Sequence, residues 1–254
     1  MHRFLILLLV VFCAVFITSS SDFRQQEISP QYAFAHIKNS VSFTPHVVVC
    51  EKNHSKEMCD ILRTSIRPVN FSKTGSGAWI KTNKGIVVLT AGHVCDSTSQ
   101  EPSVPEYLEY RGVKVRIIPE TKITIQTKFK TTEAQIIKID SSADLCLLSP
   151  KAVIVEGKNA LKVSDEPPKL YSKVTNYAAP HGLFGAEMLL KFSGYFSGIA
   201  NNNYFFSVPC KSGSSGSVIL NDKNEVISVV HSAVKTLENV CLGVQHRTLT
   251  NFLL

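Results

Sequence analysis

The amino-acid sequence predicts an all-β protein, and two observations carry that prediction. Short runs rich in β-branched residues recur along the chain, separated by Gly, Pro, Asn and Lys turns, and no long helical pattern interrupts them. The 254 residues, 44% hydrophobic and 19% charged, are enough for one large or two small hydrophobic cores. The pattern therefore indicates a β-barrel or a β-sandwich.

The first 21 residues have the pattern of a secretory signal peptide. His2 and Arg3 precede an unbroken apolar run, 4–17, and small residues follow it. The run is shorter than the roughly 20 residues of a bilayer-spanning helix. An uncleaved membrane anchor is the alternative, because Ser rather than Ala fills the small-residue stretch. Residues 22–40 are mixed and polar and are expected to form an N-terminal arm.

Two sets of expected strands follow the arm. The first set comprises residues 46–49, 77–81, 85–90, 114–118, 123–129 and 135–139. The stretch from Pro150 to Pro168 is the expected linker between the sets. The second set comprises residues 161–163, 173–177, 187–196, 204–208, 217–220, 226–234 and 242–244, and a short segment with apolar spacing, 247–254, ends the chain.

Three short motifs carry residues suited to nucleophilic chemistry. Ser215 lies in a turn of small residues, Gly-Ser-Ser-Gly-Ser. Because a serine hydroxyl is a poor nucleophile at its own pKa, it needs a base and a group that orients the base. His93 follows a buried-strand pattern in Thr-Ala-Gly-His, and Asp144 directly precedes an apolar run. Asp140 is the nearby alternative carboxylate, but no apolar strand follows it immediately.

The order His, Asp, Ser in these surroundings resembles the chymotrypsin-like serine proteases, over roughly Val41 to Leu254. The run after the nucleophile, Gly216 to Ile227, looks most like the staphylococcal glutamyl endopeptidases and the high-temperature-requirement proteases, without a PDZ domain. The resemblance implies two antiparallel six-stranded Greek-key β-barrels and a short C-terminal helix. It places His93 and Asp144 on a barrel of residues 41–155, and Ser215 on a barrel of residues 156–254.

The resemblance also assigns roles to individual residues. His93, Asp144 and Ser215 would be the catalytic triad, and the backbone N–H groups of Gly213 and Ser215 would form the oxyanion hole. Activation of the trypsin type is not expected. Ser214 stands where that mechanism needs an aspartate to receive a new N-terminus.

Six cysteines remain once the leader is removed: Cys50, Cys59, Cys95, Cys146, Cys210 and Cys241. An even number in an exported chain predicts disulfides, and no metal-ligand spacing appears, so neither zinc nor another metal is expected. The resemblance implies that Cys210 pairs with Cys241 beside the specificity pocket and that Cys95 pairs with Cys146. Cys50 and Cys59 would then close a local loop. Free thiols are the alternative for the last two pairs.

The residues around the expected substrate pocket argue against cleavage after Lys or Arg. Its floor, Val208 to Cys210, lacks the aspartate of trypsins. His231 stands where the glutamyl endopeptidases and picornavirus-type proteases place a histidine that contacts a Glu or Gln side chain. A satisfied core histidine is the alternative. The following residues, Ser232 and Ala233, would pair with the substrate as an added strand.

The net charge of +7 is scattered along the chain, and removal of the leader takes away only Arg3. Because no basic stretch is interleaved with aromatic residues, no nucleic-acid partner is expected. The sequence therefore predicts a secreted, periplasmic or extracellular serine endopeptidase. It would be a monomer acting on protein or peptide substrates, without a cofactor or membrane attachment once the leader is removed. The alternatives are a catalytically silent binding module on the same fold and a virus-type processing protease of narrow specificity.

Overall fold

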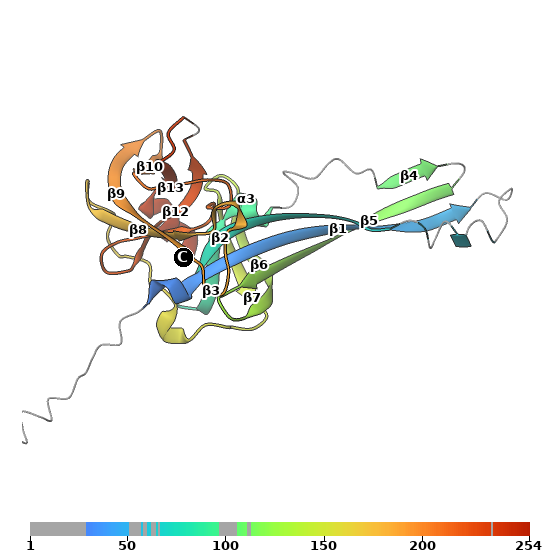
Figure 1. The fold of residues 1–254 in the computed structure, drawn as a ribbon, viewed down its shortest axis with the longest axis horizontal. Helices are drawn as coiled ribbons and strands as arrows, with labels where there is room; N and C mark the ends of the chain where they lie inside the picture. The colour runs from blue at the N-terminus through green and yellow to red at the C-terminus, as the bar shows by residue number, and fades with distance from the viewer. Residues whose placement is uncertain are drawn as a thin grey trace, which may run out of the picture.

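The computed structural model describes residues 29–50, 57, 60–61, 65, 67–96, 106–110, 113–234 and 236–254. The expected signal peptide, most of the expected arm and Cys59 lie outside the described residues. The described chain forms two lobes of antiparallel strands, the first blue to green and the second orange to red in Figure 1.

The first lobe is a closed barrel. Its strands lie in the order β1 (Phe34–Cys50), β2 (Val69–Thr82), β3 (Gly85–Ala91), β7 (Leu145–Pro150), β6 (Thr131–Asp140) and β5 (Val113–Gln126). Pairing of β1 with β5 closes the barrel, and β4 (Tyr107–Tyr110) pairs with the far end of β5. Trp79 and Ile125, both with no exposed surface, lie at the centre of its core.

The second lobe is also closed, in the order β10 (Asn203–Phe206), β13 (Cys241–Val244), β12 (Val226–Ala233), β11 (Val218–Leu220), β8 (Lys173–Ala178) and β9 (Leu190–Ala200). Helix α4 (His246–Leu253) ends the fold. The predicted all-β fold of two six-stranded antiparallel barrels with a short C-terminal helix is confirmed.

Strands β1 and β5 are longer than the sequence pattern indicated, and they run on together as a ribbon beyond the barrel (Figure 1). The two expected strands 114–118 and 123–129 form a single strand that passes through Pro119. Pro119 pairs with Phe43 of β1, beyond the last β5–β6 pair at Ile123. One edge of β5 is therefore free of β6 at this point, which is where a sheet tolerates proline.

The first barrel also begins earlier than expected. Residues 34–40, placed in the N-terminal arm by their polar composition, are the first part of β1. All of them pair with β2, and residues 36–40 also pair with β5. Ala35, Ile37 and Asn39 point inward and are at most 1% exposed. The alternation of apolar and polar residues that is typical of a strand was not recognisable in the sequence, because one of these three inward positions is a polar asparagine.

A shared apolar core joins the two barrels. Ile80 and Leu89 of the first barrel pack with Val229 of the second and with Leu249 and Phe252 of α4. The linker crosses this junction as an extended segment. Its Leu161 exchanges backbone hydrogen bonds with β2, and residues 162 and 164 exchange them with Val226. The linker therefore fixes how the barrels meet, although residues 161–163 form only isolated bridges rather than the strand expected there.

Removal of the Leu249 side chain tests this shared core. Leu249 has no exposed surface, and a buried Leu→Ala change costs about 2–5 kcal/mol through lost burial and a residual cavity. We expect Leu249→Ala to lower the free energy of unfolding by that amount in urea, followed by the fluorescence of the single tryptophan, Trp79. The exposed Leu170→Ala should change it by less than about 0.5 kcal/mol. Equal effects of the two variants would contradict a core shared between the barrels.

Candidate active site

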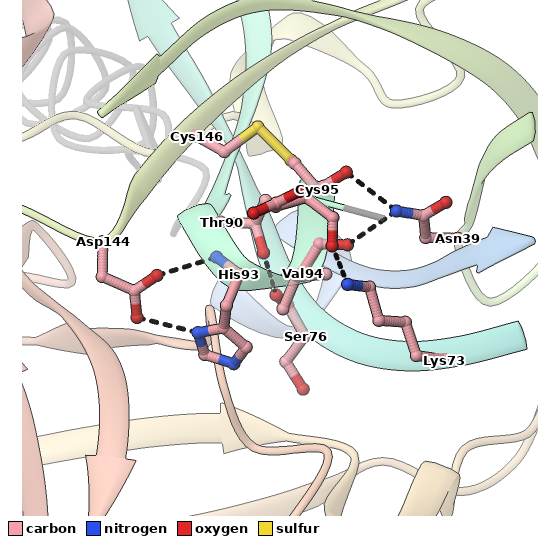
Figure 2. The surroundings of a disulfide bond; sticks show 10 residues. Asn39, Lys73, Ser76, Thr90, His93, Val94, Cys95, Asp144 and Cys146 are labelled. Atoms are coloured by element: carbon pink, nitrogen blue, oxygen red, sulfur yellow. Dashed lines mark hydrogen bonds and ion pairs between the residues drawn. A yellow bond between two sulfur atoms is a disulfide. The ribbon is translucent and has the colours of Figure 1, made fainter. Parts of the chain in front are cut away.

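His93 lies on α3 (Gly92–Cys95), a single helical turn that follows β3. The buried Asn39 amide donates to the carbonyls of Val94, at 3.1 Å, and Cys95, at 2.8 Å (Figure 2). The Lys73 ammonium donates to the next carbonyl, of Asp96. Carbonyls at a helix end lack partners within the helix. Asn39 of β1 and Lys73 of β2 thus supply the missing hydrogen-bond donors and hold the short turn that carries His93.

Both carboxylate oxygens of Asp144 bind His93 (Figure 2). One accepts the backbone N–H of His93 at 2.7 Å, and the other lies 2.8 Å from ring Nδ1. Because a carboxylate can only accept, Nδ1 carries the proton and donates it. In the neutral ring, Nε2 therefore keeps its lone pair and is available to receive a proton.

Two opposing effects act on the ionisation of Asp144. Burial alone would raise the pKa of its carboxyl, but hydrogen bonds from the His93 ring and from the His93 backbone N–H outweigh burial and hold the pKa below its ordinary value. The carboxylate is therefore ionised at neutral pH, which keeps the proton on Nδ1 of His93.

The alternative carboxylate, Asp140, has a structural role in its own turn. Its Oδ1 accepts hydrogen bonds from the backbone N–H groups of Ser142 and Ala143 and from the Ser142 hydroxyl. Asp140 therefore stabilises the turn that leads into Asp144.

The turn that carries Ser215 packs against the first barrel. The Ser215 carbonyl accepts a hydrogen bond from the Ser76 N–H of β2 at 2.8 Å. A Cβ on Gly216, whose φ is +85°, would lie 2.1 Å from Thr90 Oγ1 and 2.2 Å from the Ser76 carbonyl, so only glycine fits. The structure thus brings the Ser215 turn to the end of β3, where α3 carries His93.

Two disulfides brace these segments. Cys95–Cys146 joins α3 to β7, beside His93 and Asp144 (Figure 2), and Cys210–Cys241 joins the segment before Ser215 to β13. Both pairs are those that the family resemblance implied. The side chain of Cys50 and all of Cys59 lie outside the described residues, so that expected pair stays a prediction.

His231 lies on β12 with its ring partly buried, and its Nε2 is 2.8 Å from Asn203 Oδ1. Burial lowers the pKa of His231; the nearby Asp144 carboxylate raises it and the His93 ring lowers it. These electrostatic effects indicate that His231 lies near the His93–Asp144 pair. Ser232 and Ala233 follow on β12 and pair with β13 on one edge.

Two residues that hold this region together were missed by sequence reasoning. Asn39 carried no signal, because it lies in a polar stretch that gave no indication of burial. Ser76 lies just before the expected strand 77–81 and was not singled out, although its two glycine neighbours, Gly75 and Gly77, are a signal of close backbone contacts.

In the described ranges, no group of three or more His, Cys, Asp or Glu side chains is arranged to hold a metal ion. None of the helices in the described part of the chain is long and apolar enough to span a membrane.

The two-barrel fold defines a class, the chymotrypsin-like serine proteases. Residues 107–244, just over half of the sequence, match the family described as peptidase S7, flavivirus NS3 serine protease, and the chain belongs to this family. It is a serine endopeptidase, a hydrolase. No curated protein matches the sequence. The expected closeness to the glutamyl endopeptidase branch stays a prediction.

Several solved structures resemble this chain in fold. The active form of the Rv3671c protease from M. tuberculosis matches with a TM-score of 0.59 and 14% identity, over 89% of this chain and 81% of that one. The serine endoprotease from Yersinia pestis matches with a TM-score of 0.57 and 17% identity, over 89% of this chain and 62% of that one. At these identities the similarity concerns the fold alone.

The lowered pKa of Asp144 predicts a pH-dependent contribution to stability. A carboxyl whose pKa is lower in the folded chain stabilises the fold above its unfolded pKa of about 3.9, and loses this contribution as the pH falls through the folded value. We expect the difference in unfolding free energy between wild type and Asp144→Asn to shrink as the pH falls from 5 toward 2, measured by urea titration. Asp222→Asn, an exposed turn substitution, controls for the loss of one negative charge. A difference that stays constant with pH would contradict this prediction.

Proposed function

We propose that this endopeptidase cleaves peptide bonds through Ser215, with His93 as the general base and Asp144 as the group that orients it. The observation that carries the proposal is the double hydrogen bond from His93 to Asp144, which fixes the ring and leaves Nε2 to accept a proton. The packing of the Ser215 turn against β2 and β3, beside α3, supports it further.

The chemistry then follows from these groups. His93 Nε2 takes the Ser215 proton as Oγ attacks the scissile carbonyl, and the resulting oxyanion is received by the backbone N–H groups of Gly213 and Ser215. The imidazolium formed on His93 is stabilised by the ionised Asp144. His93 gives its proton to the leaving amine, an acyl-enzyme remains on Ser215, and water activated by the same histidine releases the acid.

The substrate would bind as an added strand along β12. Ser232 and Ala233 pair with β13 on one edge, and the pairing of β12 with β11 ends at Val229. Among the described strands, none pairs with the other edge at Ser232 and Ala233. Backbone hydrogen bonds from a substrate would fill that edge without selecting its side chains. The Cys210–Cys241 disulfide would brace the neighbouring pocket.

Selectivity would come from His231. The Asn203 amide nitrogen donates to the Asn201 carbonyl, so its oxygen faces His231 and accepts from Nε2–H. Nδ1 of the neutral ring is then an acceptor, which suits the amide N–H of a glutamine side chain. Protonation turns Nδ1 into a donor, which suits a glutamate carboxylate. We propose a preference for Gln or Glu before the scissile bond, with the protonation state of His231 choosing between them.

We infer that the protein is exported. The Cys95–Cys146 and Cys210–Cys241 disulfides are typical of oxidising compartments, and they agree with a signal peptide over residues 1–21. The two barrels would divide within the 150–168 linker, with His93 and Asp144 before it and Ser215 after it.

Substitution of the three proposed catalytic residues tests the function. We expect Ser215→Ala and His93→Ala to lower kcat by about 10⁴- to 10⁶-fold and Asp144→Asn by about 10⁴-fold, because each acts only as part of the unit. The assay is cleavage of a peptide library by leader-free protein, with the cut sites identified by mass spectrometry. Ser212→Ala, an exposed serine three residues before the nucleophile, should cut as wild type does.

Full activity of Ser215→Ala would contradict the proposed nucleophile. Absence of cleavage by the wild type, with residues 22–33 present or trimmed, would favour the binding-module alternative.

The family match to a flavivirus NS3 protease favours a narrow processing enzyme. Denatured casein separates the two kinds of enzyme, because a narrow processor would leave most of it uncut while still cutting the library.

The proposed role of His231 implies a selectivity that depends on pH. Because burial lowers the pKa of His231, the ring is neutral at pH 7.5 and we expect Gln substrates to have the higher kcat/KM. The Glu/Gln ratio of kcat/KM should rise only as the pH falls below the ordinary histidine pKa of about 6.5, measured with paired peptides that differ only at that residue. In His231→Asn the ratio should lose this pH dependence. A ratio that is unchanged with pH in the wild type would contradict a role for His231 in selectivity.

A further inference from the structure

Ser76 has an unusual position for a serine: it is completely buried on β2 of the first barrel, yet its contacts reach the Ser215 turn of the second. All of its hydrogen-bonding groups have partners. Its N–H donates to the Ser215 carbonyl at 2.8 Å, and its carbonyl accepts the Thr90 hydroxyl at 2.7 Å (Figure 2). Its side-chain hydroxyl donates to the Gly213 carbonyl at 2.8 Å and accepts the Ala179 N–H at 3.0 Å.

The Gly213 backbone is thereby held on both sides. The peptide before it is fixed by the Ser212 carbonyl, which accepts the His181 N–H at 2.6 Å. Because a trans peptide points its C=O and N–H in opposite directions, the Gly213 N–H is directed away from His181. The peptide after Gly213 is fixed by the Ser76 hydroxyl. His181 and Ser76 together therefore set the direction of the Gly213 N–H.

Such fixing matters at this position because Gly213 has little conformational preference of its own. Its φ is +90°, and a Cβ would lie 2.6 Å from the Ala179 carbonyl, so no other residue fits. Glycine rotates about φ and ψ more freely than any other residue. An oxyanion hole, in contrast, depends on donors that are held in place before the reaction begins.

We propose that Ser76 is a positioning residue for the oxyanion hole: a first-barrel hydroxyl that holds the Gly213 carbonyl and so restricts rotation about this glycine, which keeps the Gly213 N–H facing the developing oxyanion. This inference rests on the proposed function of Ser215 and Gly213. Ser76 touches no substrate in this role. Loss of its hydroxyl leaves the Gly213 carbonyl and the Ala179 N–H buried without their partner. The Gly213–Ser214 peptide can then reorient, and rotation about the glycine φ and ψ loosens the preceding peptide, which carries the Gly213 N–H.

The test compares Ser76→Ala with Ser228→Ala in the leader-free protein. Ser228 is a matched control, because it is equally buried and its hydroxyl donates to a backbone carbonyl, that of Val244, at 2.7 Å. Urea unfolding measures the stability of both variants. Steady-state kinetics give kcat and KM on a cleaved library peptide, and inhibition by the corresponding peptide aldehyde measures affinity for a tetrahedral adduct whose oxygen occupies the oxyanion hole.

We expect Ser76→Ala to lower kcat by about 30- to 300-fold, close to the loss of one oxyanion donor, with KM changed less than about threefold. Affinity for the aldehyde should fall in parallel with kcat. Ser228→Ala should lose comparable stability while keeping kcat and aldehyde affinity within about threefold of wild type. That pattern would separate positioning of the oxyanion hole from a merely structural role.

If Ser76→Ala keeps kcat and aldehyde affinity within threefold of wild type while Ser215→Ala is inactive, the inference about Ser76 is overturned and the proposed function stands. If Ser215→Ala still cleaves, both fall. Should Ser76→Ala not fold, Ser76→Thr and Ser76→Val replace it, since they have nearly the same size and differ in the hydroxyl. A Val variant as active as the Thr variant would overturn the inference.

Discussion

Apolar packing between the two barrels is the constraint on which the rest of this structure depends. Ile80 and Leu89 on the first barrel and Val229 on the second share one core, which α4 completes from outside. The linker is hydrogen-bonded to both barrels within this junction. Because the core fixes how the barrels meet, it also determines which polar groups meet at its edge. In this arrangement the Ser215 turn contacts β2 and β3.

Hydrogen bonds then refine what packing brings together. Asp144 uses both oxygens on His93, and Ser76 uses both its backbone N–H and its hydroxyl on the turn of the opposite barrel. Buried polar groups are costly when unpaired, so each of these contacts disfavours alternative arrangements of the junction. Gly213 and Gly216 are needed for a steric reason, because the neighbouring backbone leaves no room for a Cβ at either position.

The parts of the site differ in how firmly they are held. The His93 turn is held by Asn39, Asp144 and the Cys95–Cys146 disulfide. The segment before Ser215 has one disulfide, Cys210–Cys241, and the His181 and Ser76 contacts. His231 is connected to the rest through Asn203 and through the electrostatic effects of Asp144 and His93. The proposed base is thus anchored mainly in the first barrel, whereas the proposed specificity residue lies in the second.

The sequence by itself determined the strand-rich class and the motifs around His93, Asp144 and Ser215, because alternation, turn residues and short motifs are local properties of the chain. The two cysteine pairs beside them were implied by the family resemblance, and the structure shows both. Only the tertiary structure decided that residues 34–40 belong to β1, that β5 passes through Pro119, and that Asn39 and Ser76 are buried. The length of a strand depends on the partner beside it, and a buried polar residue is stable only where a distant segment supplies its hydrogen bonds. Those partners are 51 or more residues away for Asp144, Asn39 and the Ser76 hydroxyl, so no local pattern could indicate them.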